Sequence, residues 1–353
     1  MKRFSQILLM LGVAVGAFYL VLSNVEWEGT PEHPGVKDAL AQADYRLFSV
    51  GLVLFFGLHI SRAVRWGRLI QALRPDVSFR SYFSICSVGF FLINVLPFRL
   101  GEFVRPYLLF DREEIPFGSG MATVLVERVL DVLALGVLFS GVLLFADVPA
   151  WTVDFVGTDG ATETYDLVQF GRVGLLGLGV PFGGGLIALL LAGERGVALA
   201  RRFFGLFGER VASLAVGFLE SFLEAVRALG SRRAIFSVVA WTALAWGINA
   251  CSMWIMAMSF GMDAGFWDGA AILVCVCIVL IVPPTPGFVG VFELGVVMAL
   301  ALYGEPKSLG LAFGGLVHLA QFVMLAVLGS IFLVKDRISL GGVMRGMKAL
   351  RGV

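Results

Sequence analysis

The chain has 353 residues, of which 58% are hydrophobic and only 15% are charged, and its formal net charge is +1. Because ordinary soluble domains carry about 25% charged residues, this composition excludes a soluble globular protein and indicates an all-α polytopic membrane protein. The near-neutral charge favours no nucleic-acid partner. The four cysteines lie in apolar segments at spacings that fit neither a zinc site nor a redox pair, so we predict no metal and no cofactor.

The first predicted elements are two spans joined by an acidic loop. Residues 5–23 form an apolar stretch without a small-residue cleavage site after it, so we predict an uncleaved first span. The loop at 24–46 is acidic, the second span covers 47–61, and residues 62–80 carry five arginines. Since basic loops stay in the cytoplasm, the N-terminus and 62–80 are predicted inside and 24–46 outside.

Residues 82–117 are predicted to form a broken, re-entrant hairpin. Its apolar piece ends at Pro97, and Gly101 and Pro106 interrupt the sequence that follows. The next segment, 121–146, has the roughly 20 apolar residues that one crossing needs, and an acidic loop comes after it. Three full crossings would satisfy the same parity, but they would leave the charges of the hairpin outside.

The second half repeats this order upside down. Its elements are a span, a cytoplasmic linker, a span, a second broken hairpin and a last span, at 171–192, 193–233, 234–258, 269–303 and 309–334. In the linker, residues 195–229 are predicted to form an amphipathic helix on the inner membrane surface. The basic tail, 335–353, is predicted to be cytoplasmic.

These elements predict one membrane domain, 1–353, whose first half is 1–146. Residues 147–192 form the outer loop and span that open the second half, and 234–334 complete it. The fold is thus about six full spans plus two Pro/Gly-broken re-entrant hairpins in an inverted repeat, with both termini in the cytoplasm. Transporters built from inverted repeats place their sites at matching interrupted helices.

Two groups of charged residues fall at predicted membrane depth, where each charge costs roughly 2.5–3.5 kcal/mol and so marks a pathway or a site. They are Arg99, Glu102 and Arg105 after the first break and Glu127, Arg128 and Asp131 in the next span. Three cations then balance three anions in one paired network. Two plainer interpretations stay open: the first group lies in a cytoplasmic loop, or the pairs only lock the hairpin to the next span.

The second break leads to another acid, Glu293, within an apolar run. A tight outer turn with an exposed glutamate is the alternative. The helix-breaking residues of the two hairpins are Pro97, Gly101, Pro284, Pro286, Gly287 and Gly290. The residues predicted to line a lipid groove are Asn94, Arg99, Glu102, Arg105, Glu127, Arg128, Asp131 and Glu293.

His59, Arg62 and Arg65 recur at i, i+3 and i+6 at the cytoplasmic end of the second span. They are either an ordinary positive-inside signal or a place where an anionic head group enters. The sequence has no nucleotide-binding loop and no hydrolase or metalloprotease motif. We therefore predict no catalytic residue, and we expect neither ATP-driven pumping nor a fused transferase.

Three motifs stand in order along the chain: N-V-L-P-F-R-L-G-E-F-V-R at 94–105, V-E-R-V-L-D at 126–131 and P-T-P-G-F-V-G-V-F-E at 284–293. With them the chain resembles, over roughly 45–335, the flippase-like family known as the lysylphosphatidylglycerol synthase transmembrane region. The resemblance implies lipid translocation, and fused members of the family move aminoacylated phosphatidylglycerol. This sequence lacks the aminoacyl-transfer domain, which removes the case for a synthase.

The expected function is a lipid flippase of the bacterial cytoplasmic (inner) membrane that does not use ATP. Its partners would be membrane lipids, either an anionic phospholipid or a polyprenyl-phosphate-linked lipid, with arginine contacting phosphate because guanidinium forks suit it. Two alternatives stay open: a membrane enzyme with Glu102 or Asp131 as base, and an accessory subunit of a synthase or glycosyltransferase. The sequence leaves the oligomeric state open.

Overall fold

The computed structural model describes residues 26–29, 34–96, 101–146, 152–156, 162–166, 169, 192–206, 208–228, 230–280 and 285–350. The spans predicted at 5–23 and 171–192, and the residues Pro97, Arg99 and Pro284, lie outside the described residues.

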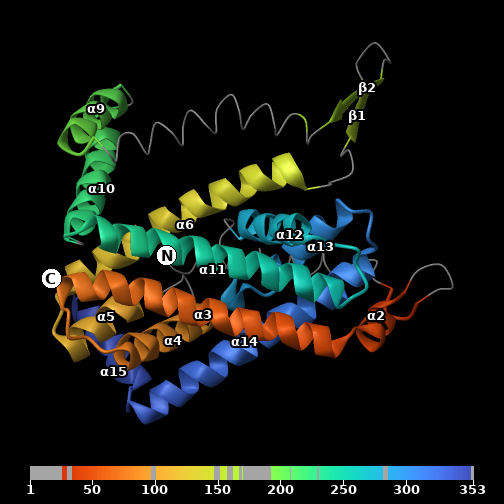
Figure 1. Ribbon diagram of the computed structural model, residues 1–353, viewed down its shortest axis with the longest axis horizontal. Coiled ribbons are helices and arrows are strands. Elements are labelled where there is room, and N and C mark those ends of the chain that lie inside the picture. Colours follow the sequence, from red (N-terminus) through yellow and green to blue (C-terminus); the bar gives the residue numbers. More distant parts are fainter. Residues whose placement is uncertain are drawn as a thin grey trace, which may run out of the picture.

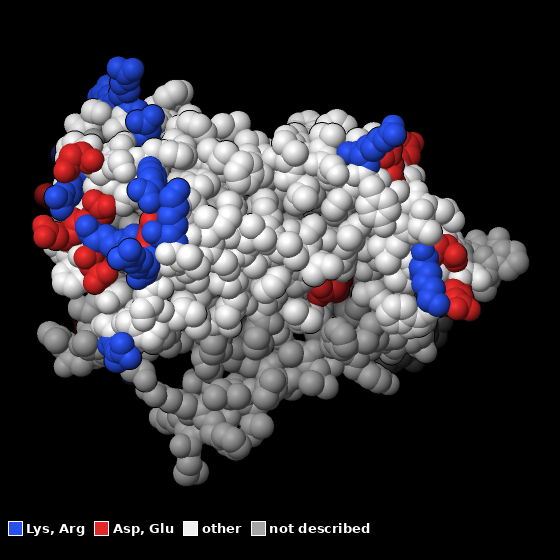
Figure 2. Space-filling model, turned by 90° about the horizontal axis from the view of Figure 1, so that it is seen from below, with Lys and Arg blue, Asp and Glu red and all other residues white. Residues whose placement is uncertain are grey.

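Four long helices form the body of the molecule (Figure 1). They are α3 (Tyr45–Leu73), α6 (Phe117–Phe145), α11 (Arg232–Met258) and α14 (Lys307–Lys335). Each contains an apolar stretch long enough to cross a membrane. On the face seen in Figure 2, charged side chains gather toward both ends, with a nearly uncharged band between them. The prediction of an all-α polytopic membrane protein is confirmed.

Two broken helical hairpins lie among these long helices. The first consists of α4 (Phe79–Val95) and α5 (Gly101–Glu113), and the second of α12 (Phe266–Val279), the short 3-10 helix η3 (Pro286–Phe288) and α13 (Val291–Ala301). Both breaks fall where Pro and Gly predicted them. Each broken helix is shorter than the roughly 20 residues of a full crossing.

The two hairpins start from opposite ends of the molecule. At the feet of the first, Ser81 donates a hydrogen bond to Glu113. The arginines Arg80 and Arg112 flank this foot and pair with Asp336, just after α14 ends, at 3.0 and 3.3 Å. The second hairpin has its feet near the start of α14.

The feet of the second hairpin are also joined. The Tyr303 hydroxyl, just after α13, donates to Asp268 Oδ1 in the first turn of α12 at 2.9 Å. Nearby in the chain, Ser308 at the start of α14 donates to the Pro34 carbonyl before α2 (Val36–Gln42) at 2.7 Å. Since α14 runs the length of the molecule (Figure 1), the two pairs of feet lie at its two ends.

The tips of the hairpins meet inside the molecule. A Cβ placed on Gly287 would lie 3.6 Å from the main-chain oxygen of Asn94, at the end of α4. Gly287 has φ +65°, a left-handed conformation that favours glycine. On the other side of the first break, a Cβ on Gly101 would come within 2.2 Å of the Ile93 nitrogen, so glycine lets α5 pack directly on α4.

The two halves share one order of elements and one set of contacts. Each runs long helix, short helix, break, short helix, long helix. The helices α3 and α11 pack against each other, and the short α4 of the first half packs on α14 just as the short α12 of the second half packs on α6. Each main contact between two helices therefore has a counterpart between the corresponding helices of the other half.

The linker differs from the prediction of one amphipathic helix at 195–229. It forms two helices, α9 (Glu194–Gly205) and α10 (Glu209–Ala228), which pack against each other through Ala200, Leu219 and Leu223. Gly208, with φ +105°, lies between them, a left-handed conformation that favours glycine and does not continue a helix.

Three smaller elements complete the described chain. The helix α15 (Leu340–Leu350) follows α14 and packs on α5. In the predicted outer loop, β1 (Thr152–Val156) and β2 (Thr162–Asp166) form an antiparallel hairpin. This hairpin is the one departure from helix among the regular elements of the described residues.

Candidate functional site: a buried arginine–carboxylate cluster

Glu127 and Asp131 form the acidic centre of the site, one turn apart on α6. Arg65 of α3 bridges them: its Nη2 lies 3.1 Å from Glu127 Oε1 and its Nη1 lies 2.5 Å from Asp131 Oδ1. The side chains of Arg65 and Glu127 are 2% and 0% exposed. A buried carboxylate is stable only when it is paired and hydrogen-bonded, and here one guanidinium serves both acids.

The first hairpin contributes a second arginine. Arg105 of α5 places Nη2 at 2.7 Å from Glu127 Oε2, and both side chains are fully buried. Its guanidinium carbon lies 4.9 Å from the ring centre of Trp66 and 5.1 Å from that of Phe90, so aromatic faces stabilise the charge. Gly89 makes room for it, because a Cβ there would come within 2.3 Å of Arg105 Cγ.

The cluster opens toward the surface at its other side. Arg128 Nη2 lies 3.4 Å from Asp131 Oδ2, and these side chains are 42% and 19% exposed. From α11, Trp246 donates its indole N–H to Asp131 Oδ1 at 3.1 Å. Asp131 therefore accepts hydrogen bonds from α3 and α11 and forms an ion pair with Arg128, whose side chain is the more exposed of that pair.

A fourth arginine, Arg62, faces the cluster without a partner acid. It lies over the Phe90 ring at 5.6 Å and interacts electrostatically with Asp131, Arg65 and Arg128. It also interacts with the thiol of Cys277, which lies in the second hairpin. Within the described residues, no carboxylate lies within 4.0 Å of Arg62.

The cluster therefore carries more positive than negative charge. Four arginines surround two carboxylates, which leaves two positive charges uncompensated among the described residues. Charge is costly at membrane depth, so this surplus fits an anion that binds beside the cluster. Arg62 and Arg128 are the two arginines of the cluster that do not pair with Glu127.

The second hairpin has its own polar pair. Glu293, in the first turn of α13, lies 2.7 Å from His318 Nδ1 of α14 and accepts a 2.7 Å hydrogen bond from the Gly290 N–H. The His318 ring stacks on Phe292 with centres 4.6 Å apart. The Glu293 side chain is 12% exposed, so the alternative of an exposed outer glutamate is wrong.

The two polar pairs join matching helices in the two halves. In the first half, a cation of α5, Arg105, pairs with an anion of α6, Glu127. In the second half, an anion of α13, Glu293, contacts a histidine of α14, His318. Each hairpin is thereby tied to the long helix that follows it.

Sequence reasoning found part of this arrangement. Two residues of the predicted network, Arg128 and Asp131, form an ion pair three positions apart on α6. The predicted balance of three cations and three anions did not include Arg65, which takes a central place in the cluster, and its member Arg99 lies outside the described residues. The groove residue Asn94 lies at the hairpin tip, where its side-chain amide donates to the Phe90 carbonyl at 2.8 Å.

The prediction for the end of the second span needs correction. The helix α3 continues to Leu73, so residues 62–73 are not a loop. His59 is 3% exposed and its Nε2 lies 2.9 Å from Ser87 Oγ, and Arg65 is 1% exposed. Neither can receive a head group at the surface. The helical spacing of His59, Arg62 and Arg65 was recognised, but the arginines were interpreted as the start of a loop although apolar residues such as Trp66, Leu69 and Ile70 continue the helical pattern between them.

The fold and the cluster define a polytopic, all-helical membrane protein whose polar site lies inside the helix bundle. The chain belongs to the family described as the lysylphosphatidylglycerol synthase TM region, whose family model matches residues 7–329. This confirms the family expected from the three motifs.

Similar proteins come from archaea. A UPF0104 membrane protein of Methanothermobacter thermautotrophicus is 23% identical over 337 residues, which cover 93% of this chain and 94% of that protein. The UPF0104 membrane protein PH1989 of Pyrococcus horikoshii is 23% identical over 360 residues, or 96% and 98% of the two chains. Both matches cover nearly the whole length of the relative and of this chain.

A longer relative is the glycosyltransferase AglD of Haloferax volcanii. It is 27% identical over 296 residues, which cover 75% of this chain and 45% of that protein, so the chain spans less than half of that relative's length. No solved structure matches the chain.

Proposed function

We propose that the protein moves a phosphate-bearing lipid across the cytoplasmic membrane without ATP, along a groove between two re-entrant hairpins. The observation that carries the proposal is the surplus of two positive charges where the first hairpin meets α3 and α6. A lipid phosphate supplies the missing negative charge, and guanidinium groups bind it with paired hydrogen bonds.

The hairpin geometry supports a path with access from both sides. The two pairs of hairpin feet lie at opposite ends of the long helices, and the tips meet at Asn94 and Gly287. If the long helices cross the membrane, one hairpin enters from each leaflet. Together with the matching contacts of the halves, this is the arrangement of an inverted repeat, in which the halves rock about a central site.

The residues of the cluster divide into two roles in this proposal. Glu127 with Arg65 and Arg105 is fully buried and holds α3, α5 and α6 together. Arg62 and Arg128 contact the lipid phosphate. Asp131 accepts hydrogen bonds from Arg65 and Trp246 and forms an ion pair with Arg128, so it can release Arg128 to a phosphate while it keeps its two hydrogen bonds.

The basic end of the molecule is proposed to face the cytoplasm, with the acidic loop 24–46 outside. The lipid is either a phospholipid or a polyprenyl-phosphate-linked lipid. The relative named a glycosyltransferase favours a lipid that carries sugar, and it also supports a second candidate function. In that candidate, the protein is an accessory subunit or an enzyme of lipid-linked sugar synthesis.

Reconstitution in liposomes tests the proposal. The rate of movement of fluorescent phospholipid and of a polyprenyl-phosphate lipid between leaflets is measured for the wild-type protein, Arg62→Gln and Arg128→Gln. We expect each variant to lose at least about tenfold in rate, because a hydrogen bond to a charged group is worth about 1.5–3 kcal/mol. Arg46→Gln, an exposed arginine at the other end of α3, is the matched control and should keep the wild-type rate.

The outcomes separate the candidates. Equal rates in all four proteins would count against transport through the cluster. Product formation from a lipid-linked sugar in detergent, where there is no bilayer to cross, would support the enzyme. Purification with a stoichiometric glycosyltransferase, and no transport by the isolated chain, would support the accessory subunit.

A further inference from the structure

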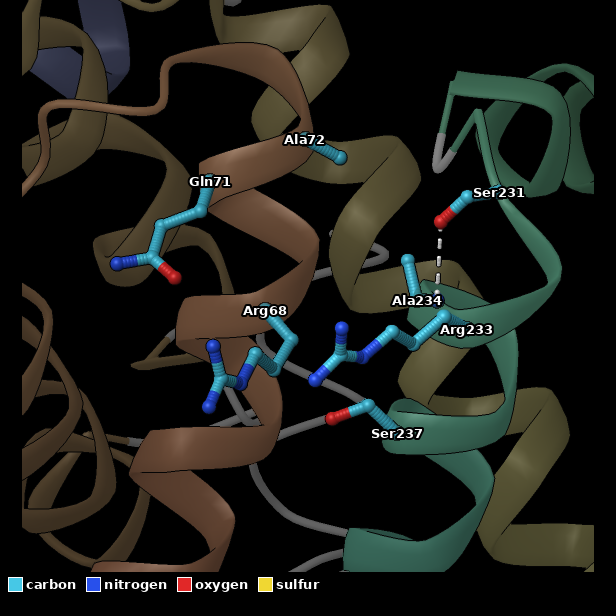
Figure 3. A pocket seen from close by; sticks show the side chains of 7 residues that line it. All are labelled: Arg68, Gln71, Ala72, Ser231, Arg233, Ala234 and Ser237. Atoms are coloured by element: carbon cyan, nitrogen blue, oxygen red, sulfur yellow. Dashed lines mark hydrogen bonds between the residues drawn. The ribbon is translucent and has the colours of Figure 1, made fainter.

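A second cationic site lies between α3 and α11, nearer the basic end of the molecule than the buried cluster. A cavity of about 480 Å³ is lined there by Arg68 and Gln71 of α3 and by Ser231, Arg233 and Ser237 at the start of α11. Figure 3 shows the Arg233 guanidinium extending from α11 toward α3, while the Arg68 guanidinium lies against α3, and both residues line the cavity. Arg68 follows Arg65 by one helical turn, but it is exposed, whereas Arg65 is buried.

Neither of the two arginines has an acidic partner among the residues that the structure describes. Within the described part of the chain, no carboxylate lies within 4.0 Å of Arg68 or Arg233. Other arginines at this end do have such partners, for example Arg80 and Arg112 with Asp336. Like charges that share a cavity repel each other, so an anion between Arg68 and Arg233 would lower the electrostatic energy.

Neutral donors complete the cavity. Ser231 caps α11: its oxygen accepts the Ala234 N–H at 3.1 Å, which leaves its O–H to donate (Figure 3). The Ser237 hydroxyl points into the same space. The positive end of the dipole of a 27-residue helix adds to the field. Two guanidinium forks with hydroxyl donors suit the oxygens of a phosphate group.

An apolar surface leads from the cavity toward the uncharged band. Ala240 and Leu244 follow Arg233 at i+7 and i+11, so the three residues share one face of α11. Ala240 is exposed and Leu244 is 47% exposed. A ligand with a phosphate in the cavity can therefore lay an acyl chain along α11.

We propose that this cavity binds the phosphate group of an anionic phospholipid from the adjacent leaflet. The site uses none of the cluster residues, so a test of this site does not depend on whether the protein transports lipid. The chemistry that it recognises is a phosphate group, which a lipid or free phosphate can present. The apolar surface below the cavity favours the lipid.

Thermal unfolding of the purified full-length protein in a neutral detergent tests the site. Short-chain phosphatidylglycerol, short-chain phosphatidylcholine and inorganic phosphate are titrated separately. The proteins compared are the wild type, Arg68→Gln, Arg233→Gln and the control Arg232→Gln, an exposed neighbour in the same helical turn that does not line the cavity.

Phosphatidylglycerol should raise the unfolding temperature of the wild type and of Arg232→Gln at lower concentration than phosphatidylcholine. Arg68→Gln and Arg233→Gln should need at least about tenfold more phosphatidylglycerol, because each loses a charged hydrogen bond to phosphate. Inorganic phosphate could also protect the wild type as well as phosphatidylglycerol does, and lose this effect in the same two variants. That result would support a phosphate site but assign it to free phosphate.

The proposal is overturned if phosphatidylglycerol leaves the wild type unchanged, or protects all four proteins alike. We do not expect the variants to misfold, because both arginines are exposed and removal of either one relieves the repulsion between their charges. Without ligand, each variant should unfold at or above the wild-type temperature. The charge reversal Arg233→Glu adds a further readout: it should stabilise the ligand-free protein by pairing with Arg68 and should abolish protection.

Discussion

Glu127 is the residue on which the buried cluster depends. It is fully buried, and it is the only residue of the described cluster that pairs with arginines from both α3 and the first hairpin, Arg65 and Arg105. Arg62 is the opposite case, a cation with no described partner acid. The geometry thus separates residues that hold the helices together from residues that are free to meet a ligand.

Glu127→Gln should destabilise the protein by about 3–5 kcal/mol, because two buried guanidinium groups then face a neutral amide. Arg62→Gln should change stability by no more than about 1 kcal/mol, since it removes a charge that no described carboxylate compensates. Unfolding of both variants in detergent, followed by circular dichroism, checks the order. Similar losses in the two variants would contradict the division into holding and ligand-binding residues.

Single residues also show which contacts could be predicted from the sequence and which could not. The pair of Arg128 with Asp131 follows from spacing on one helix, so it was predictable. The contact of Arg65 with Glu127 joins residues 62 positions apart, and only tertiary packing brings them together. Positive charge at the end of a span was interpreted as a loop, because hydropathy cannot tell a solvated arginine from one paired inside the bundle.

At the scale of elements, glycine and proline gave the most reliable predictions. Both hairpins break within a few residues of the predicted positions, since these residues cannot continue a regular helix. The linker was predicted less well. Gly208 adopts a positive φ and lets α9 fold back on α10, and that packing depends on contacts such as Ala200 with Leu219 that no local pattern reveals.

Gly101 and Gly287 should tolerate alanine differently. At Gly101 a Cβ would lie 2.2 Å from a main-chain nitrogen, so Gly101→Ala must push α5 away from α4. At Gly287 the nearest atoms are 3.6 Å away, so Gly287→Ala meets only the strain of a left-handed residue, about 1–2 kcal/mol. Thermal unfolding should rank Gly101→Ala as the less stable variant.

The matched control is Gly136→Ala in the long helix α6, where a Cβ would meet nothing within 4 Å. Alanine is the better helix former by roughly 0.5–1 kcal/mol, so this change should be neutral or stabilising. A loss at Gly136 as large as that at Gly101 would show that the detergent-solubilised protein responds to any added methyl group and not to the close approach of α4 and α5.

At the scale of the whole molecule, the halves are joined by α3 against α11 and by the meeting of the hairpin tips. The order of elements was predictable, because it is encoded in hydropathy and in the breaks. The helix contacts between the halves were not predictable. The contacts of α4 with α14 and of α12 with α6 join distant parts of the chain. In the proposed transport, the contact at the tips opens and closes.

Cross-linking the tips tests this movement. With the four native cysteines replaced by alanine, Asn94→Cys and Gly287→Cys are joined by a short bifunctional thiol reagent. A protease site at Gly208 then allows cleavage of the linker, so that only cross-linked halves stay together on a denaturing gel. We expect efficient cross-linking, because the tips are in contact. In the control, Asn94→Cys with Ala301→Cys, the second thiol lies at the far end of α13, about 15 Å further along the helix, and should not react.

Liposomes that contain the cross-linked protein should lose lipid movement and recover it when a cleavable reagent is reduced. An unchanged rate with the tips joined would mean that the hairpins do not move apart during transport, and the proposed path between them would be wrong.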